Sequence, residues 1–557
     1  MKKLNRLIAA ALALSMMLSV SACKVNFGIH GKTEVSTGTT ATETGTEATT
    51  TTTSETSEST KATESEGYPE KGCKIEFKPQ DQRYHYDMDL TLDKEKNTVG
   101  GHVVFTFFND SGKDWEELCL RDYSSLYKSP DKVGYDPAVK THGEITDIKN
   151  IVDGRTGNQI TMKRDEDESV VWLPLGSKLA PGEKMTLSYD FVAKIPTVAD
   201  RYGVQDGVYN VTNFYPILAE YTRDGWSHEA FYSTGECFFS EISDYDVKLT
   251  VPEKMVVLTT GLEQGETKGT GTKTITIHAD CVRDFVFSAS EDFKLVEGDY
   301  NDTHIRVAYT EEKNPKIDKK YADESLRVSK ESLYAFGQAF GEYPYKDLEV
   351  ILAPIAAGGM EYPNLIIISK DFPDGMDDDF LDSYVTEMAE EVVSHEIGHQ
   401  WFMGIVGSNS GLQPWLDESF ASYTEQVYQD FFHPNQKTGT IDFGEDHFHD
   451  EDGNVAGPED KPPYYPINRS FYEFSDEWSF VVGVYYQGKA ALIAMEKAVK
   501  RNVFHGIIRE YVRNNAFRNA DQSDFFKVLY KYAGTDNEKL NEIMEKYFDE
   551  KALPNAA

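Results

Sequence analysis

The residues best suited to chemistry are His395-Glu396-Ile397-Gly398-His399, with Glu418 nineteen residues after the second histidine. Residues four apart on a helix lie on one face, so both histidines can direct an imidazole nitrogen at one metal ion. Glu418 would add a carboxylate as third ligand, and Glu396 would stand beside the metal as a base for water. Two histidines, a glutamate and an open coordination position are typical of a catalytic zinc, so we predict one Zn²⁺. The pentapeptide alone also fits an amphipathic helix whose two histidines bind no metal. The neighbouring sequence is therefore needed to choose between the two interpretations.

The sequence pattern around these residues changes near residue 296 from one typical of strands to one typical of helices. Residues 84–290 alternate apolar and polar side chains between turn-forming segments, which predicts an antiparallel β-sandwich. Farther along, helical periodicity dominates, and we expect helices over 321–341, 380–405 and 415–432 and in the last sixty or so residues. The predicted fold class is α+β, with a sandwich domain at 73–295 and a mainly helical domain at 296–557.

The first residues read as an export signal. Three basic residues precede an apolar run, 7–20, that is short for a membrane span. Val20-Ser21-Ala22-Cys23 resembles a bacterial lipobox, which predicts a signal peptide over 1–22 and lipid on Cys23; ordinary signal cleavage near an accidental cysteine is the alternative. The stretch up to residue 72 is rich in Thr, Ser and Glu and predicts a disordered tether. We therefore expect a lipid-anchored protein on the outer face of a cell membrane.

Composition narrows the possible partners. The net charge of −38 argues against nucleic acid, whose phosphates it would repel. Apart from Cys23, the cysteines are widely spaced and lack metal-type spacing. They could form two disulfides or remain buried thiols, and the size of the core favours thiols slightly.

Four motifs together resemble the aminopeptidase N family of zinc metallopeptidases, over about residues 83–545. They are His395–Trp401, Trp415–Ala421, Gly358–Tyr362, which stands where the family has Gly-Ala-Met-Glu-Asn, and Val484–Gly488, which is similar to the family's Tyr-x-x-Gly segment. The resemblance implies a β-sandwich followed by a thermolysin-like zinc peptidase domain. It also implies that a peptide with a free N-terminus is the substrate.

The resemblance implies catalytic roles as well. His395, His399 and Glu418 would hold the zinc. Glu396 would take the proton of the attacking water. Tyr485 would donate a hydrogen bond to the developing oxyanion, and the neighbouring Tyr486 is the alternative for that position.

A substrate-binding role is implied for Gly358, Gly359, Met360 and Glu361. The Glu361 carboxylate would pair with the free α-ammonium of the peptide through charge-assisted hydrogen bonds. A second amine-binding side chain is expected from the sandwich domain, and Glu220 and Glu229 are the candidates.

The sequence also departs from the family pattern. Tyr362 replaces the usual asparagine, so a substrate contact made by that amide must be absent or supplied otherwise. We expect a short form that lacks the family's C-terminal helical domain and has a more open cleft. An acidic loop at 442–454 contains His447 and His449, but its spacing fits no common metal motif and favours a solvated loop.

These observations favour a zinc aminopeptidase. A zinc endopeptidase of the thermolysin type is the alternative within the hydrolases, and the Gly-Gly-Met-Glu segment disfavours it. A non-catalytic surface binding protein with the same fold is the alternative from another class. The intact set of ligands and base argues against it.

Overall fold

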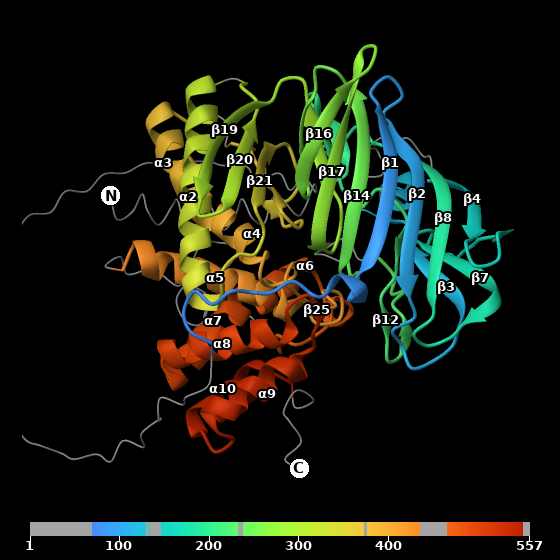
Figure 1. The fold of residues 1–557 in the computed structure, drawn as a ribbon. Coiled ribbons are helices and arrows are strands. Elements are labelled where there is room, and N and C mark those ends of the chain that lie inside the picture. The colour runs from blue at the N-terminus through green and yellow to red at the C-terminus, as the bar shows by residue number, and fades with distance from the viewer. Residues whose placement is uncertain are drawn as a thin grey trace, which may run out of the picture.

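The computed structural model describes residues 69–129, 133, 146–231, 235, 238–312, 314–372, 376–434 and 465–549. The signal segment, Cys23, most of the tether and the acidic loop 442–454 lie outside the described residues. A large sheet-rich part is followed along the chain by a mainly helical part (Figure 1). The predicted fold class is thereby confirmed.

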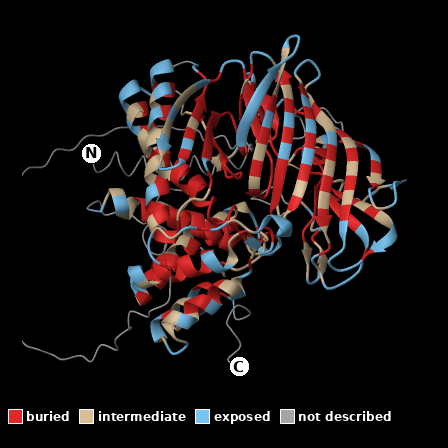
Figure 2. Cartoon of the chain, in the orientation of Figure 1, coloured by how far each residue is buried: buried red, intermediate tan, exposed pale blue. Residues whose placement is uncertain are grey.

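The sheet-rich part is organised around one eight-stranded sheet. In spatial order its strands are β16 (Leu262–Lys268), β17 (Thr272–Val282), β14 (Ser243–Pro252), β1 (Tyr84–Asp93), β2 (Thr98–Phe108), β8 (Lys184–Lys194), β4 (Asp147–Asp153) and β5 (Asn158–Gln159). Along β1 every second residue is buried, so one face meets the core and the other faces solvent. Figure 2 shows this alternation as bands across the strands. β1 and β14 run parallel, which is an exception to the predicted antiparallel arrangement.

Two four-stranded sheets supply the other side of this core. They are β15 (Val256–Thr259), β18 (Phe287–Ser290), β10 (Val208–Val211) and β9 (Gly203–Gln205), and β11 (Ile217–Leu218), β3 (Trp115–Arg121), β7 (Val170–Leu179) and β6 (Lys163–Arg164). A small hairpin pairs β12 (Tyr221–Thr222) with β13 (Gly225–Trp226). The Leu218 N–H donates to the Tyr86 hydroxyl at 3.2 Å, and the rings of Phe107 and Trp115 stack at 6.4 Å. These contacts join the sheets through one apolar core.

The helical part contains a five-stranded sheet that the sequence pattern did not predict. Its order is β19 (Lys294–Tyr300), β20 (Thr303–Tyr309), β21 (Asp347–Ala353), β23 (Leu365–Ser369) and β22 (Gly359–Met360). β21 is buried along its whole length, including the carboxylates of Asp347 and Glu349. Its second half, 350–353, is an apolar run that periodicity cannot distinguish from a buried helix. A last short pair joins β24 (Val406–Gly407) to β25 (Arg518–Asn519).

Helices form most of the rest of this part of the chain, and the longest of them packs against β19 and β20. They are α2 (Pro315–Phe340), α3 (Asp378–Met388), α4 (Ser394–Gly398), α5 (Glu418–Phe432), α6 (Glu477–Phe480), α7 (Gly488–Val499), α8 (Arg501–Asn515), α9 (Gln522–Ala533) and α10 (Glu538–Tyr547). α2 begins earlier than predicted because the Asn314 side chain accepts the Ile317 N–H and Pro315 occupies the first helical position. Among helices of the described residues, none combines the length and apolar content that a membrane span needs.

The helix predicted over 380–405 is wrong in its extent. α3 passes into a π-helical segment, Ala389–Val393, and α4 then ends at Gly398, so residues up to 405 form turns. Met403 has a φ of 116°, a left-handed value that a helix excludes. The amphipathic pattern continues past the end of the helix because these turns are also buried, as Trp401 and Ile405 illustrate.

The cysteines that the structure describes are free thiols. Cys119 and Cys281 are buried, and Cys73 is partly buried. The interpretation as thiols is correct for these three, whereas Cys237 lies outside the described residues. Burial raises the pKa of Cys119 and of Cys281 to about 12, so both thiols stay protonated and unreactive.

Candidate metal centre

His395, His399 and Glu418 converge on one point. The Nε2 atoms of the two histidines are 3.2 Å apart, and Glu418 Oε2 lies 3.2 Å from one and 3.4 Å from the other. Donor atoms that lie about 2.0–2.1 Å from a tetrahedral ion are about 3.3–3.4 Å from one another. The triangle of donors therefore has the size that a zinc ion requires.

The Nδ1 atom of each imidazole contacts a carboxylate. His395 Nδ1 lies 2.8 Å from Glu425 Oε1, and His399 Nδ1 lies 2.6 Å from Asp417 Oδ1. Lys489 Nζ donates to the other oxygen of Glu425 at 2.6 Å. Hydrogen bonds on Nδ1 orient the rings and leave Nε2 for a metal, which is the usual arrangement around metal-binding histidines.

The charge balance of the site also suits a cation. Buried or nearly buried carboxylates of Glu361, Glu396, Asp417 and Glu418 surround the two imidazoles. Burial would lower the pKa of His395, but its hydrogen bonds to Glu418 and Glu425 raise it to about 10. The site therefore attracts positive charge, and a divalent ion would supply it.

The local fold explains why the ligands meet. Glu418 is the first residue of α5, which packs against α4. The two helices come close at Gly398, where an added Cβ would lie 2.2 Å from Thr424 Oγ1. A π-helical segment directly precedes α4 and His395, and such segments are frequent at functional sites.

Glu396 lies beside the candidate ligands. A carboxylate oxygen of Glu396 lies within 4.8 Å of a ring nitrogen of His399, and Oε2 is buried without a hydrogen-bond partner among the described residues. Burial raises the pKa of Glu396 to about 7. Gly359 covers the carboxylate so closely that a Cβ there would lie 2.2 Å from Oε1. A glycine at 359 is therefore needed for β22 to lie over this base.

Glu361 follows β22 directly and reaches the same centre. Its carboxylate lies within 4.8 Å of donor atoms of Glu396 and His399, and burial raises its pKa to about 8. Gln400 fixes the following turn: its side chain accepts the Asn364 N–H at 3.0 Å and donates to the Tyr362 carbonyl at 3.0 Å. The residue after the second histidine thus ties the Glu361 segment to the metal-binding segment.

The glycines and the methionine beside Glu361 have different surroundings. Open space lies beside Gly358, where an added Cβ would meet nothing within 4 Å. Met360, in contrast, is 1% exposed and packs in an apolar cluster beneath β22. Only the backbone of Met360 is therefore placed to meet a substrate.

Tyr485 faces the ligands from a second π-helical segment, Val481–Gln487. Its ring lies nearly parallel to that of His395, with centroids 6.0 Å apart, and the Phe480 ring packs on its edge at 5.8 Å. Burial raises the pKa of Tyr486, and the charges of Glu391 and Glu425 raise it further. Tyr485 therefore stacks beside His395, one of the three candidate ligands.

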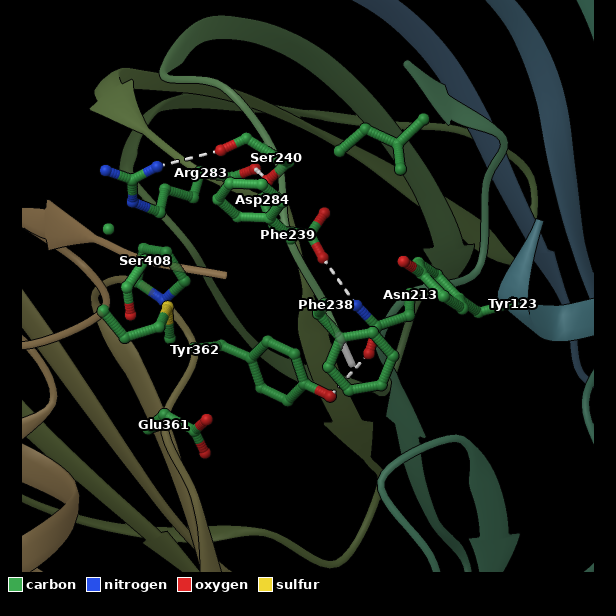
Figure 3. A pocket seen from close by; sticks show the side chains of 14 residues that line it. Tyr123, Asn213, Phe238, Phe239, Ser240, Arg283, Asp284, Glu361, Tyr362 and Ser408 are labelled. Carbon is green, nitrogen blue, oxygen red and sulfur yellow. Dashed lines mark hydrogen bonds between the residues drawn. The ribbon is translucent and has the colours of Figure 1, made fainter. Parts of the chain in front are cut away.

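A pocket continues from Glu361 into the junction of the two parts of the chain (Figure 3). Its walls include Tyr123, Asn213, Phe238, Arg283 and Asp284 from the sheet-rich part and Glu361, Tyr362, Met403 and Ser408 from the helical part. The Tyr362 hydroxyl bonds Thr212 Oγ1 at 2.8 Å and donates to Asn213 Oδ1 at 2.7 Å. Tyr362, which stands where the family has asparagine, therefore anchors the Glu361 segment to the sheet-rich part.

The two candidates for a further amine-binding acid engage other groups. Glu220 is buried beside Glu241 and Asn519, and burial raises its pKa well above the usual range. Glu229 accepts a hydrogen bond from Ser227 Oγ at 2.6 Å. The second amine-binding side chain stays unassigned.

Sequence reasoning missed the groups that orient the ligands. Glu425 lies seven residues after Glu418, a spacing of two helical turns that places both on one face of α5 and could have indicated the role. Asp417 adjoins Glu418 but was given no role. Lys489 offered no signal, because its contact with Glu425 joins residues 64 apart.

We expect Asp417→Asn and Glu425→Gln each to weaken zinc affinity by about 10- to 100-fold, because the histidines lose the carboxylates that orient them. Competition with a chromogenic chelator measures this affinity. Asp430→Asn is the matched control, since Asp430 lies on α5 but pairs with Arg501. Equal zinc affinity in all three variants would contradict the orienting role.

Comparison with known families and proteins adds independent information. Residues 324–547 match the peptidase family M1 domain. The chain is 25% identical over 233 residues to Aminopeptidase M1 of Arabidopsis thaliana and 26% identical over 266 residues to Tricorn protease-interacting factor F2 of Thermoplasma volcanium. These matches cover 41% and 47% of this chain but 25% and 32% of the two relatives. The chain thus aligns with about a quarter to a third of their length.

Solved structures resemble the chain over most of its length. An M1 zinc metallopeptidase from Deinococcus radiodurans matches with a TM-score of 0.56 and 17% identity, over 87% of this chain and 96% of that one. A two-domain M1 zinc metallopeptidase variant bound to L-arginine matches with a TM-score of 0.56 and 16% identity, over 82% and 93%. At these identities the likeness concerns the fold. It supports the order of a sheet-rich and then a helical domain.

Proposed function

We propose that this chain, whose residues 324–547 match the peptidase family M1 domain, is a zinc aminopeptidase that releases N-terminal residues from peptides. The observation that carries the proposal is the position of Glu361, a buried carboxylate within 4.8 Å of donor atoms of Glu396 and His399. One Zn²⁺ held by His395, His399 and Glu418 fits the spacing of their donor atoms.

The residues around the proposed zinc position have separate roles in the proposed reaction. When bound, zinc supplies Lewis-acid chemistry that acidifies water and polarises a carbonyl. Glu396, whose Oε2 lacks a partner among the described residues, takes the proton of the attacking water and passes it to the leaving amine. Tyr485, stacked beside His395, donates a hydrogen bond to the oxygen of the scissile carbonyl as charge develops there.

Glu361 explains why cleavage would start from the amino end. A buried carboxylate is stabilised in its charged form by a cationic partner, and the α-ammonium of a peptide is such a partner. Because Glu361 lies next to the metal ligands, an ammonium bound there places the first peptide bond at the ion. An endopeptidase would require the peptide backbone to continue past this acid.

Free and N-acetylated forms of one peptide distinguish the two activities. We expect acetylation to lower kcat/KM by about a hundredfold or more, because the amide cannot pair with Glu361. Glu361→Gln should lower kcat/KM for the free peptide by about ten- to a hundredfold and leave the acetylated peptide little changed. Equal cleavage of both peptides by the unaltered protein would refute the aminopeptidase proposal.

We further propose that lipid on Cys23 anchors the enzyme to the outer face of a bacterial cell membrane. The lipobox-like sequence and the Thr-, Ser- and Glu-rich stretch that follows it support this location. Cys23→Ser is expected to move the protein from the membrane fraction to the soluble fraction without loss of peptidase activity. An unchanged membrane fraction in that variant would contradict the anchor.

A further inference from the structure

A second group of histidines and aspartates lies on the solvent face of the eight-stranded sheet, away from the peptidase site. It consists of His85 and Asp87 on β1, Asp246 on β14 and His278 on β17. The strand register places Asp87 directly opposite Asp246, and Asp246 directly opposite His278. Each of the four side chains is partly or fully exposed to solvent.

Three of these side chains place donor atoms close to one another. His85 Nε2 lies 3.3 Å from Asp246 Oδ2 and 3.8 Å from Asp87 Oδ2, and the three atoms lie within 4.8 Å of one another. The first separation matches the distance of about 3.3–3.4 Å between neighbouring ligands of a tetrahedral ion, and the second is wider. The same kind of donor set, imidazole plus carboxylate, forms the proposed catalytic site.

His278 contacts the carboxylate of Asp246 on the side away from His85. Its Nδ1 lies 2.7 Å from Asp246 Oδ1, the carboxylate oxygen that does not face His85. A hydrogen bond there orients the carboxylate and leaves Oδ2 for a cation, as carboxylate and imidazole partners do around other metal sites.

The group contains two carboxylates and neither lysine nor arginine, and His278 Nε2 also lies 3.4 Å from a third carboxylate, that of Asp280. Two aspartates directly opposite each other on neighbouring strands repel. Within the described ranges, the ion pairs of Asp87 and Asp246 are with histidines alone. The nearby Arg83 is held at 2.5 Å by Asp244 and at 3.1 Å by Asp280. A divalent cation would neutralise the pair.

We propose that His85, Asp87 and Asp246 form a second divalent-metal site, which takes Zn²⁺ or a similar transition-metal ion with water in the remaining positions. The ion would link β1 to β14, two parallel neighbours in the sheet that lie far apart in the sequence. The site faces solvent, so it exchanges metal readily and is separate from peptide hydrolysis.

Zinc stoichiometry of the full-length protein tests the site. After equilibrium dialysis against micromolar free Zn²⁺, elemental analysis is expected to find one equivalent more in the unaltered protein than in His85→Ala or Asp246→Asn. Direct titration should show the affinity for this equivalent falling at least about tenfold, because a ligand is lost. His102→Ala is the matched control, since His102 lies on the same face and contacts one carboxylate, Asp190, at 2.7 Å. It should keep the extra equivalent.

Two further measurements separate the possible outcomes. Peptidase activity and the melting temperature without added metal should be the same in all these variants, which shows that they fold. In a His399→Ala background the zinc equivalent at His85, Asp87 and Asp246 should still bind. The second metal site can therefore be tested even if the catalytic zinc proposal fails. The proposal is overturned if the His85 and Asp246 variants bind as much zinc as the unaltered protein.

Discussion

Replacing Glu396 with glutamine is expected to lower kcat by about a thousandfold or more while zinc stays bound. The amide has the shape of the carboxylate but cannot accept the proton of water. Glu396 is buried and is not one of the three proposed ligands, so the metal site should keep its geometry. Hydrolysis of an N-terminal amide substrate measures the loss, and elemental analysis measures the zinc.

A matched variant strengthens this test. Glu418→Gln alters a proposed ligand and should lose both zinc and activity, whereas Glu396→Gln should lose activity alone. Undiminished turnover in Glu396→Gln would remove the residue from its role as base. Loss of zinc in that variant would show that it acts as a ligand instead.

The second large effect is expected for Tyr485→Phe, which should lower kcat by about 10²- to 10³-fold with little change in KM. The hydroxyl would stabilise a charge that exists only in the transition state, so its removal affects kcat rather than ground-state binding. The ring remains, and with it the packing on His395 and Phe480.

Tyr486→Phe provides the control from the adjacent position. Tyr486 lies near the charges of Glu391 and Glu425 rather than stacked beside His395. We expect its replacement to leave kcat within a few-fold of the original value. If kcat fell greatly in Tyr486→Phe but little in Tyr485→Phe, Tyr486 would be the residue that stabilises the oxyanion.

Local sequence was sufficient to predict many elements and to single out three candidate ligands whose donor atoms converge in the structure. The spacing of His395 and His399 encodes a shared helix face, and alternation along residues 84–92 encodes a half-buried strand. Both signals depend on the geometry of one segment alone. The resemblance to the peptidase family M1 domain, which residues 324–547 match, likewise depends on short contiguous motifs.

Local sequence failed where burial hides the periodicity. The second half of β21 and nearly all of β23 are buried runs of apolar residues without alternation, so the five-stranded sheet was missed. The helix predicted to reach residue 405 ends at Gly398, where α4 packs closely on α5. The apolar residues that follow are buried in turns, so they keep a helix-like pattern without forming a helix.

The tertiary structure alone decided how the site is supported. Glu425 meets Lys489 across 64 residues, and Tyr362 meets Asn213 across 149 residues. His85 likewise meets Asp246 only because β1 pairs with β14. Sequence spacing determines which side chains share a face of one element, but contacts between elements depend on how the whole chain packs. The three candidate ligands could therefore be proposed from the sequence, whereas long-range contacts such as that of Glu425 with Lys489 could not.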